Sequence, residues 1–373
     1  MNRSLKILII GGGVGGMATA IAFARYGIQA DLVDIDPHWK VLGAGITITG
    51  PTLRAFKTLG VIDEVAAEGS FSATVGLYTQ TGNLIVEHTM PPLVADLPAT
   101  GGILRPVLHR ILSTHTLRVG TQVRLGLTVA GFAQSDAGVE VAFSDGSSGH
   151  YDLVVGADGV NSGVRDMLFP DAPKPELTGQ GCWRVLADRP PGVKGAQMYY
   201  GKDSKAGITP CSPDKVYMFL NNTMLGNPWV DPVEGIEQLR AHLAGFGGAI
   251  ATVREGLGPD SAFNYRPLAA LLLQRPWSVG RVGLIGDACH ATTPHLASGA
   301  GITVEDALVL AEEMMAASSV EEGWQRFEAR RWERCSMVVK TSVRLGAMEI
   351  AQEEGNEQAK VFGEAMAALM QTI

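Results

Sequence analysis

The sequence predicts an α/β fold in which a parallel-sheet unit is joined to a second β-sheet domain and closed by C-terminal helices. The apolar run from Leu5 to Ile10 ends in glycines, as expected for a buried parallel strand. The stretch from Val14 to Arg25 is apolar nearly all round, which is typical of a buried helix, and Ala30 to Val33 resumes as a strand. These three segments form one βαβ unit, whereas residues 179–221 indicate strands of a separate antiparallel sheet.

The other elements follow in order along the chain. A short helix is expected at Pro51–Leu59 and another helix at Arg105–Leu117. Gly138–Phe143 alternates as a strand, buried strands are expected at Tyr151–Val155 and Arg281–Ile285, and a helix follows at Ile302–Met315. Ser319 and Glu322 form a capping box that opens the C-terminal helices. The apolar stripe of these helices is interpreted as core and contains Trp324, Phe327, Cys335, Val338 and Val339.

Composition excludes several classes of protein. The chain has 373 residues, which is long for one hydrophobic core and suggests two intertwined domains. Charged residues make up only 18%, and the net charge is −8 without a basic run, so neither disorder nor nucleic-acid binding is indicated. No apolar run is long enough for a membrane span. None of the four cysteines belongs to a CxxC pair, which argues against a metal site and fits a cytoplasmic protein.

A glycine-rich turn joins the first strand to the first helix. Its spacing is GxGxxG, with Gly11, Gly13 and Gly16 at the fixed positions and Val14 and Gly15 between the last two. The first glycine permits a tight turn, the second lets the backbone approach a pyrophosphate, and the third lets the helix pack on the strand. The helix N-terminus then offers free N–H groups and a favourable dipole to the phosphates. In this strand–turn–helix context the motif predicts dinucleotide binding.

An acidic residue ends the second strand. Asp34 can accept hydrogen bonds from a ribose diol and disfavours a 2′-phosphate, whereas Asp36 is expected to be solvated. This first motif does not separate FAD from NAD, and a glycine-rich turn without a ligand is the alternative.

Two later motifs make the comparison specific. One runs from Asp152 through Gly156-Ala157-Asp158-Gly159 to Arg165. The other begins at Gly286-Asp287-Ala288-Cys289-His290 and continues through Pro294, Gly299-Ala300-Gly301 and Glu305-Asp306. With all three motifs in order, the chain resembles the class A flavoprotein monooxygenases, the family of para-hydroxybenzoate hydroxylase. Reductases and halogenases that share the fold are the main alternatives.

The resemblance implies that one non-covalent FAD is bound. It places Asp287 at the ribityl chain, Arg105 at the flavin, and Asp158 at FAD and NAD(P)H, although Asp158 has a turn-stabilising role as its alternative. A helix N-terminus pointing at the isoalloxazine would stabilise reduced flavin by about 0.3–1 kcal/mol. The chain departs from the family in having Ala297-Ser298-Gly299 in place of Gly-Gln-Gly, and Gly301 where Asn is frequent. The remaining cofactor-binding candidates from this motif are Gly286, Pro294, Gly299, Ala300 and Gly301.

The implied architecture is a Rossmann-like FAD domain interleaved with a mixed β-sheet substrate domain and closed by C-terminal helices. The FAD domain is expected at residues 1–72, 97–176 and 268–318, the substrate sheet at 73–96 and 177–267, and the helices at 319–373. The implied reaction uses NAD(P)H and O₂ and hydroxylates a small aromatic or N-heteroaromatic ring through a C4a-hydroperoxyflavin. A reductase or dehydrogenase of the same fold, or a non-catalytic flavin-binding sensor, is the alternative. We expect a monomer or homodimer.

Candidates around the substrate come from the second sheet and the loops near it. Tyr217 is expected to share a proton with the substrate, Lys205 to offset phenolate charge, and His295 to relay the proton to solvent. For each, an ordinary sheet, loop or surface role is the alternative, as it is for Thr47. Tyr217 and Phe219 should face the same side of their strand. His290 is expected to be a structural hydrogen bonder, and Trp183-Arg184 to cover the flavin domain.

Overall fold

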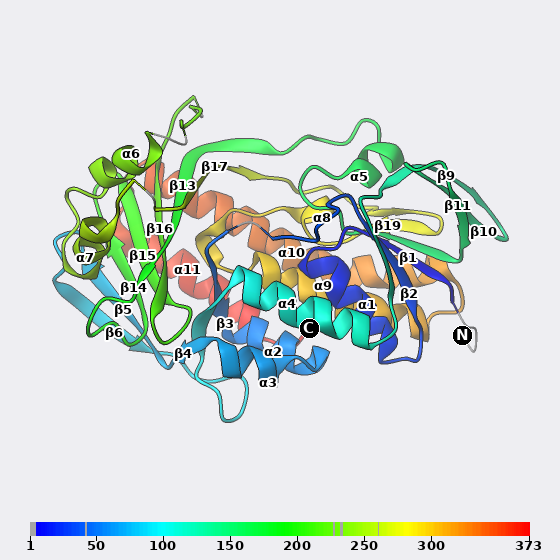
Figure 1. Cartoon of the computed structure of the whole chain (residues 1–373), viewed down its shortest axis with the longest axis horizontal. Coiled ribbons are helices and arrows are strands. Elements are labelled where there is room, and N and C mark those ends of the chain that lie inside the picture. Colours follow the sequence, from blue (N-terminus) through cyan, green and yellow to red (C-terminus); the bar gives the residue numbers. More distant parts are fainter. Residues whose placement is uncertain (1–4, 42, 227, 232–233, 260) are drawn as a thin grey trace.

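The computed structural model describes residues 5–41, 43–226, 228–231, 234–259 and 261–373. Within them the chain forms two halves, each built on its own sheet, with long helices running along both (Figure 1). The predicted domain ranges also include residues 1–4, 42, 227, 232–233 and 260, which lie outside the described residues.

The first half is built on a six-stranded sheet with the order β18-β19-β12-β1-β2-β8. Its centre, β1 (Ile7–Ile10), pairs in parallel with β2 (Ala30–Asp34) and β12 (Leu153–Gly156). All four β1 residues are buried, which explains their continuous apolar run. The other members of the sheet are β8 (Gln122–Leu125), β19 (Val282–Leu284) and the antiparallel β18 (Ser278–Val279), and a three-stranded sheet packs nearby: β9 (Val129–Ser135), β10 (Gly138–Phe143) and β11 (Ser148–Tyr151).

Helices cover this sheet. The helix α1 (Val14–Ala24) follows β1 and packs against α9 (Gly299–Ala316) and α4 (Arg105–Arg118). A small sheet of β3 (Gly45–Thr49), β7 (Thr100–Leu104) and β4 (Ser70–Ser72) contacts strands of the second half. The remaining elements of this half are α2 (Gly50–Leu59), α3 (Ile62–Glu68), α5 (Gly163–Leu168), α8 (Asp287–His290) and the 3₁₀ helix η1 (Pro294–Leu296).

The second half is a seven-stranded sheet with the order β17-β13-β16-β15-β14-β5-β6. Every neighbouring pair is antiparallel except β14 with β5, which makes the sheet mixed. The helices α6 (Gly235–His242) and α7 (Gly248–Gly256) cover its outer face and close a second hydrophobic core. The strands are β17 (Phe263–Ala270), β13 (Glu176–Asp188), β16 (Lys215–Thr223), β15 (Ser204–Pro210), β14 (Ala196–Tyr200), β5 (Thr74–Thr79) and β6 (Leu84–Thr89).

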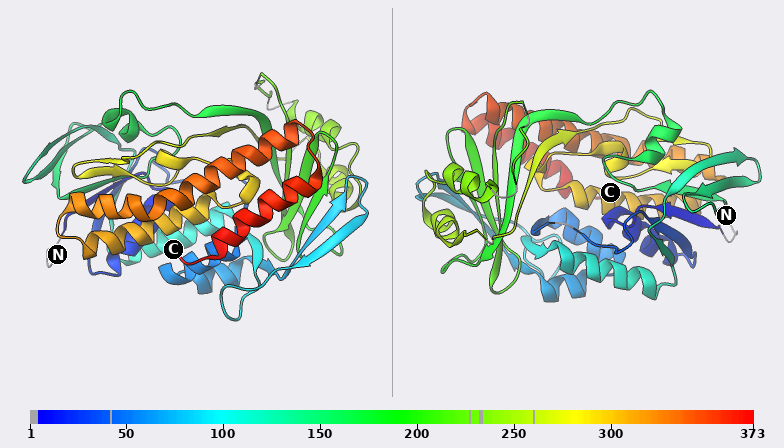
Figure 2. Two further views of the ribbon diagram at one scale, coloured as in Figure 1. Left: turned by 180° about the vertical axis from the view of Figure 1, so that it is seen from behind. Right: turned by 45° about the horizontal axis from the view of Figure 1, so that its top comes forward.

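Two C-terminal helices lie behind both halves (Figure 2). The longer, α10 (Val320–Ile350), packs on α9 and reaches β13, and α11 (Gly355–Met370) returns along α10 to α2. The predicted stripe on α10 is buried as expected. Among the described residues, no helix has the length and apolarity needed to cross a bilayer.

Most of the predicted elements are present, and the predicted fold class is confirmed. The strand predicted at Tyr151–Val155 is wrong at its start, because Tyr151 ends β11 and β12 begins at Leu153. The capping box is half formed: the Ser319 hydroxyl accepts the Glu322 N–H at 3.1 Å, while the Glu322 carboxylate accepts the N–H of Ser318 at 2.8 Å. The predicted domain division stays a prediction, supported by the two separate cores.

Candidate active site

The glycine-rich turn has the geometry that its sequence predicts. A Cβ on Gly16 would lie 1.8 Å from the Gly11 carbonyl oxygen, and one on Gly11, at φ +105°, would lie 2.4 Å from the Ala157 oxygen. In contrast, no heavy atom lies within 4 Å of the Cβ position on Gly13, so the turn is open there. The N-terminus of α1 has no side-chain cap and no acidic residue in its first turn. These features fit an anionic pyrophosphate.

Asp34 lies beside this turn. Its carboxylate accepts the N–H of Gly12 at 2.5 Å and that of Asp36 at 2.7 Å. The indole N–H of Trp39 donates to the Gly12 carbonyl at 2.8 Å. Asp36 instead accepts the backbone N–H groups of His38 and Lys40, and these hydrogen bonds lower its pKa. Asp34 is therefore the acid next to the dinucleotide turn. Each of its two oxygens accepts one N–H and keeps a further acceptor position, and its contact with the ribose stays a prediction.

The last motif brings a loop and a helix N-terminus to the same region. Gly286 precedes α8, and its N–H donates to Asp306 Oδ2 at 3.0 Å. Asp287 follows Gly286, and part of its surface is exposed to solvent. Desolvation of its carboxyl by the surrounding protein raises its pKa. The helix α9 begins at Gly299, and its N-cap, Ser298, provides no side-chain cap. A Cβ on Gly301 would lie 2.3 Å from Thr52 Oγ1, which explains a glycine where the family often has Asn.

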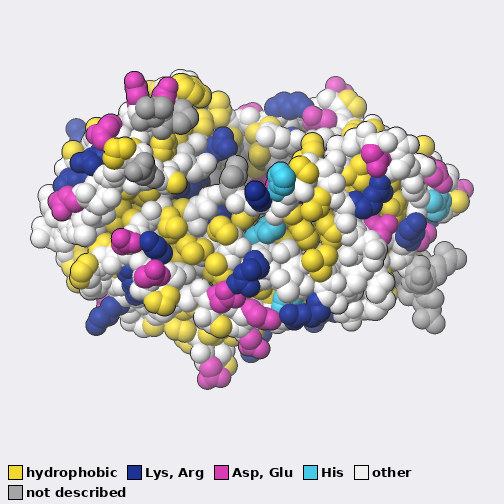
Figure 3. Space-filling model, in the orientation of Figure 1, with side chains coloured by type: hydrophobic (Ala, Val, Ile, Leu, Met, Phe, Trp, Pro, Cys, Tyr) yellow, Lys and Arg dark blue, Asp and Glu magenta, His cyan; other side chains and the backbone are white. Residues whose placement is uncertain are grey.

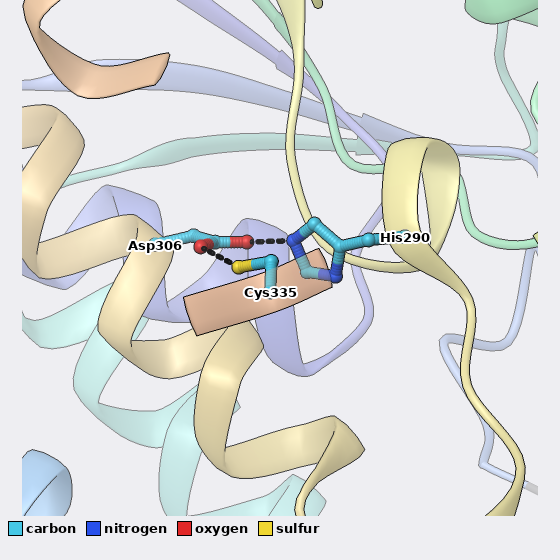
Figure 4. A group of neighbouring side chains, drawn as sticks. All are labelled: His290, Asp306 and Cys335. Atoms are coloured by element: carbon cyan, nitrogen blue, oxygen red, sulfur yellow. Dashed lines mark hydrogen bonds and ion pairs between the residues drawn. The ribbon is translucent and has the colours of Figure 1, made fainter. Parts of the chain in front are cut away.

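A buried network of polar side chains holds the loop at Gly286–His290 in place, and Figure 4 shows three of its members: His290, Asp306 and Cys335. The His290 ring donates to Asp306 Oδ2 at 2.6 Å, and Arg331 Nε donates to Asp306 Oδ1 at 2.7 Å. All three side chains are at most 1% exposed. Burial lowers the pKa of His290, but the surrounding acidic groups outweigh it and raise the pKa well above the usual value. His290 is therefore a charged structural residue, consistent with its predicted role.

The same group resembles a metal site only in its spacing. One ligand atom each of His290, Asp306 and Cys335 lies within 4.8 Å of the others. Arg331, however, already donates to Asp306 and carries a fixed positive charge into the cluster. A cation there would face both Arg331 and the protonated His290. The arrangement is that of a buried ion-pair network.

Asp158 is held within its own turn. It accepts the Ser162 hydroxyl at 2.5 Å and the Val164 N–H at 3.0 Å, which occupies both carboxylate oxygens at the start of α5. Burial raises the pKa of this carboxyl. This geometry favours the turn-stabilising alternative for Asp158, and its contact with FAD or NAD(P)H stays a prediction.

Arg105 begins α4 and faces the second sheet. Its Nε is buried and has no hydrogen-bond partner among the described residues. Burial lowers the pKa of the guanidinium, and the groups whose charges act on it include Tyr217, Arg184 and Asp287. An orphaned donor of this kind, near enough to Asp287 for its carboxylate to act on the guanidinium, fits the carbonyl and nitrogen acceptors of an isoalloxazine ring.

The inner face of the second sheet supplies the opposite wall. The rings of Tyr217 and Phe219 lie 5.9 Å apart on β16, so the two residues share a face as predicted. Arg184 of β13 lies on this face, because it pairs with Phe219 in the register of β13 and β16, and it is close enough to Tyr217 to influence its pKa. The hydroxyls of Thr47 and Thr209 lie 3.1 Å apart. A hollow between the two halves, rimmed by basic and histidine side chains, is visible in Figure 3.

The structure separates the three predicted catalytic residues. Lys205 lies opposite Asn221 on the sheet, four positions along β16 from Tyr217, or about 13 Å at strand spacing. Lys205 forms an ion pair with Glu349 of α10, and His295 lies 3.3 Å from the same carboxylate. Lys205 and His295 therefore both contact Glu349, at a distance from Tyr217.

Sequence reasoning missed two of these groups and misplaced a third. Glu349 gives no local signal, because its partners are 54 and 144 residues away. Arg184 was expected only as cover, since its distance to Tyr217 depends on strand register. Trp183 does not cover the flavin half, because it lies in the outer core against Phe263 and Tyr265.

Residues 4–342 match a known family, described as the FAD binding domain. The chain belongs to this family. Among its relatives, the 2-heptyl-3-hydroxy-4(1H)-quinolone synthase of Pseudomonas aeruginosa is 30% identical over 82% of this chain and 80% of its own length. The 6-hydroxynicotinate 3-monooxygenase of Bordetella bronchiseptica is 28% identical over 92% of this chain and 91% of its own.

A solved structure shows the same fold. HpxO of Klebsiella pneumoniae, in complex with FAD and uric acid, superposes with a TM-score of 0.83 at 22% identity, covering all of this chain and 94% of HpxO. For this FAD-binding-domain protein, the predicted FAD cofactor and flavin-dependent monooxygenase class are confirmed by the family and its relatives. The individual site residues stay predictions, and the geometry around Gly13, Asp34, Arg105 and α9 fits FAD.

Proposed function

We propose that this monooxygenase uses NAD(P)H and O₂ to hydroxylate a small aromatic or N-heteroaromatic ring bound between the flavin half and the inner face of the second sheet. The observation that carries the proposal is the meeting of Tyr217, Phe219 and Arg184 with Arg105 across this space. The relatives support the class of substrate, since their names refer to a quinolone and a hydroxynicotinate.

Bound FAD would supply the redox and oxygen-transfer chemistry, held by Gly13, Asp34, Arg105, Asp287 and the start of α9. The chain's own residues hold the ring and its hydrogen-bonding groups. Phe219 leans across Gly207, where a Cβ would lie 2.4 Å from its ring, and so forms a flat apolar wall. Such a wall fits an aromatic substrate and excludes water from it.

Tyr217 acts as a hydrogen-bond donor in this scheme. Burial raises the pKa of its phenol, so it is protonated at neutral pH. The nearby Arg184 can only donate to the Tyr217 oxygen, because a guanidinium has no acceptor. The Tyr217 O–H is then free to donate to a ring oxygen of the substrate. Lys205 and His295 are proposed to act from a distance, because Glu349 binds both.

The test is Tyr217→Phe, with substrate binding, flavin reduction and product yield measured separately. We expect flavin reduction to continue while product per NAD(P)H falls several-fold and hydrogen peroxide rises. Tyr199→Phe is the matched control, because Tyr199 is a buried tyrosine of the same sheet whose hydroxyl bonds Gln197 in the outer layer. Wild-type coupling and affinity in Tyr217→Phe would remove this residue from the site.

The alternatives are separated by the fate of oxygen. Incorporation of ¹⁸O from ¹⁸O₂ into a product identifies hydroxylation, whereas a reductase or dehydrogenase gives a product without the label. A flavin-binding sensor would hold FAD that NAD(P)H never reduces. The monomer or homodimer and the cytoplasmic location stay predictions.

A further inference from the structure

Two arginines from opposite walls meet in the proposed substrate space. Arg105 projects from the start of α4, and Arg184 from the middle of β13. They are close enough for the charge of Arg184 to lower the pKa of Arg105. Across the described ranges, no carboxylate lies within the 4.0 Å ion-pairing distance of either guanidinium, although Asp287 is near enough to favour the charge of Arg105.

The groups that face Arg184 do not neutralise it. They are the thiol of Cys182 and the phenol of Tyr217. Burial raises the pKa of both, so both are neutral at physiological pH. A largely buried guanidinium without an anion is unfavourable, because desolvation is not offset by an opposite charge. The site therefore has unused affinity for an anion.

FAD accounts for one of the two arginines. Arg105 lies with Asp287 at the flavin loops, and its unpaired Nε is explained by the ring of the cofactor. Arg184 lies on the sheet, directly opposite Phe219 in the register of β13 and β16. A cationic group next to a flat apolar wall matches an aromatic ring that carries a negatively charged oxygen.

We propose that Arg184 is a specificity-determining residue that binds an anionic oxygen of the ring substrate. The inference rests on the proposed function and narrows it: the enzyme takes small rings with a carboxylate or an acidic ring oxygen in preference to neutral rings. Arg184 also orients Tyr217, which donates a second hydrogen bond to the same ring. A neutral ring leaves the guanidinium unpaired and binds more weakly.

The experiment measures binding to the oxidised holoenzyme through the change in its flavin absorbance. Each probe has a neutral counterpart: 6-hydroxynicotinate with 2-hydroxypyridine, and urate with hypoxanthine. The first pair tests a carboxylate and the second an acidic ring. We expect at least one anion to bind ten-fold or more tightly than its counterpart. If neither anion binds more tightly than its neutral counterpart, the proposal is overturned.

The variants assign this preference to Arg184. Arg184→Gln should weaken binding of the anion by about 10- to 100-fold, because one charge-assisted hydrogen-bonded contact is lost. Binding of the neutral counterpart should weaken by less than about three-fold. Arg184→Lys keeps the positive charge but lacks the planar set of N–H donors of a guanidinium, so it should retain part of the preference for anions. Arg118→Gln removes an equal charge from an exposed site on α4 and should leave binding unchanged.

Two results would contradict the assignment. Equal weakening of the anion and its neutral counterpart in both Arg184 variants would make Arg184 a structural support of Tyr217. Loss of FAD in both would make it a cofactor residue. Because binding is measured without turnover, a selective anion site in a protein that hydroxylates none of the probes would leave this inference standing and count against the proposed function.

Discussion

Replacing Asp306 with Asn should weaken the flavin half from inside. Asp306 is fully buried and accepts hydrogen bonds from His290, Arg331 and the Gly286 N–H at 2.6, 2.7 and 3.0 Å. Arg331 keeps its ion pair with Glu305 at 3.0 Å, but the substitution leaves the buried, protonated His290 without an anion, which costs about 3–5 kcal/mol. With 373 residues and an unfolding entropy of about 2.1 cal/mol/K per residue, the melting temperature should fall by about 4–6 °C.

The effect should depend on pH in a defined way. The pKa of Asp306 is lowered to about 2, so its contribution is present above its ordinary pKa of 3.8 and is lost as pH falls through about 2. The pKa of His290 is raised above 6.5, so its contribution is complete below 6.5 and is lost as pH rises through the raised value. The difference from wild type should therefore be largest between pH 3.8 and 6.5.

The assay is thermal unfolding of the apoprotein followed by circular dichroism, so that FAD binding does not enter. Asp166→Asn is the control, because Asp166 pairs with Lys174 at 2.7 Å on the surface, with 48% of its side chain exposed. Such a pair contributes at most about 1 kcal/mol. A melting temperature for Asp306→Asn within 1 °C of the control would refute the reasoning.

Three further predictions concern the cofactor and the distant ion pair. Asp34→Ala should weaken FAD binding by about 10- to 100-fold, from one lost charge-assisted hydrogen bond, in reconstitution of the apoprotein; unchanged affinity would separate Asp34 from the ribose. Gly16→Ala should give protein purified without yellow colour, because its Cβ would meet the Gly11 carbonyl oxygen at 1.8 Å, and normal FAD content would contradict this. Lys205→Met should raise the pKa of Glu349 from about 2, because its main cation is removed. The native Glu349 contribution is present above pH 4.5 and lost as pH falls through about 2, so denaturant titrations should show a smaller stability loss on acidification in the variant.

The sequence predicts the flavin half well because its motifs are local. Gly11 to Gly16 and Asp34 belong to one βαβ unit, so their proximity follows from chain geometry alone. The stretch from Gly286 to Gly301 is likewise one strand–loop–helix passage. For Asp158, the motif is recognisable; two hydrogen bonds within its own turn favour the turn-stabilising alternative, and its contact with FAD or NAD(P)H stays a prediction.

The substrate wall is different because it depends on strand register. Whether Arg184 meets Tyr217 is set by the pairing of β13 with β16, where a shift of one residue would turn Arg184 to the outer core and Trp183 inward. No periodicity within either strand specifies that pairing. The grouping of Lys205 and His295 on Glu349 also joins three distant segments, which pattern reasoning cannot bring together.

The helix α10 has a mechanical consequence. Just over a third of the way along it, Arg331 is bound into the network that holds the Gly286–His290 loop, and near its end, Glu349 holds Lys205 of the second sheet. A single rigid rod of 31 residues, about 46 Å long, thus spans from one half to the other. The spacing between the second sheet and the first half is set by the segment of this helix between the two anchors, so insertion of one helical residue between positions 331 and 349 would rotate one anchor by about 100° relative to the other. Chimeras that exchange the second sheet between relatives therefore need to carry the matching α10 with it.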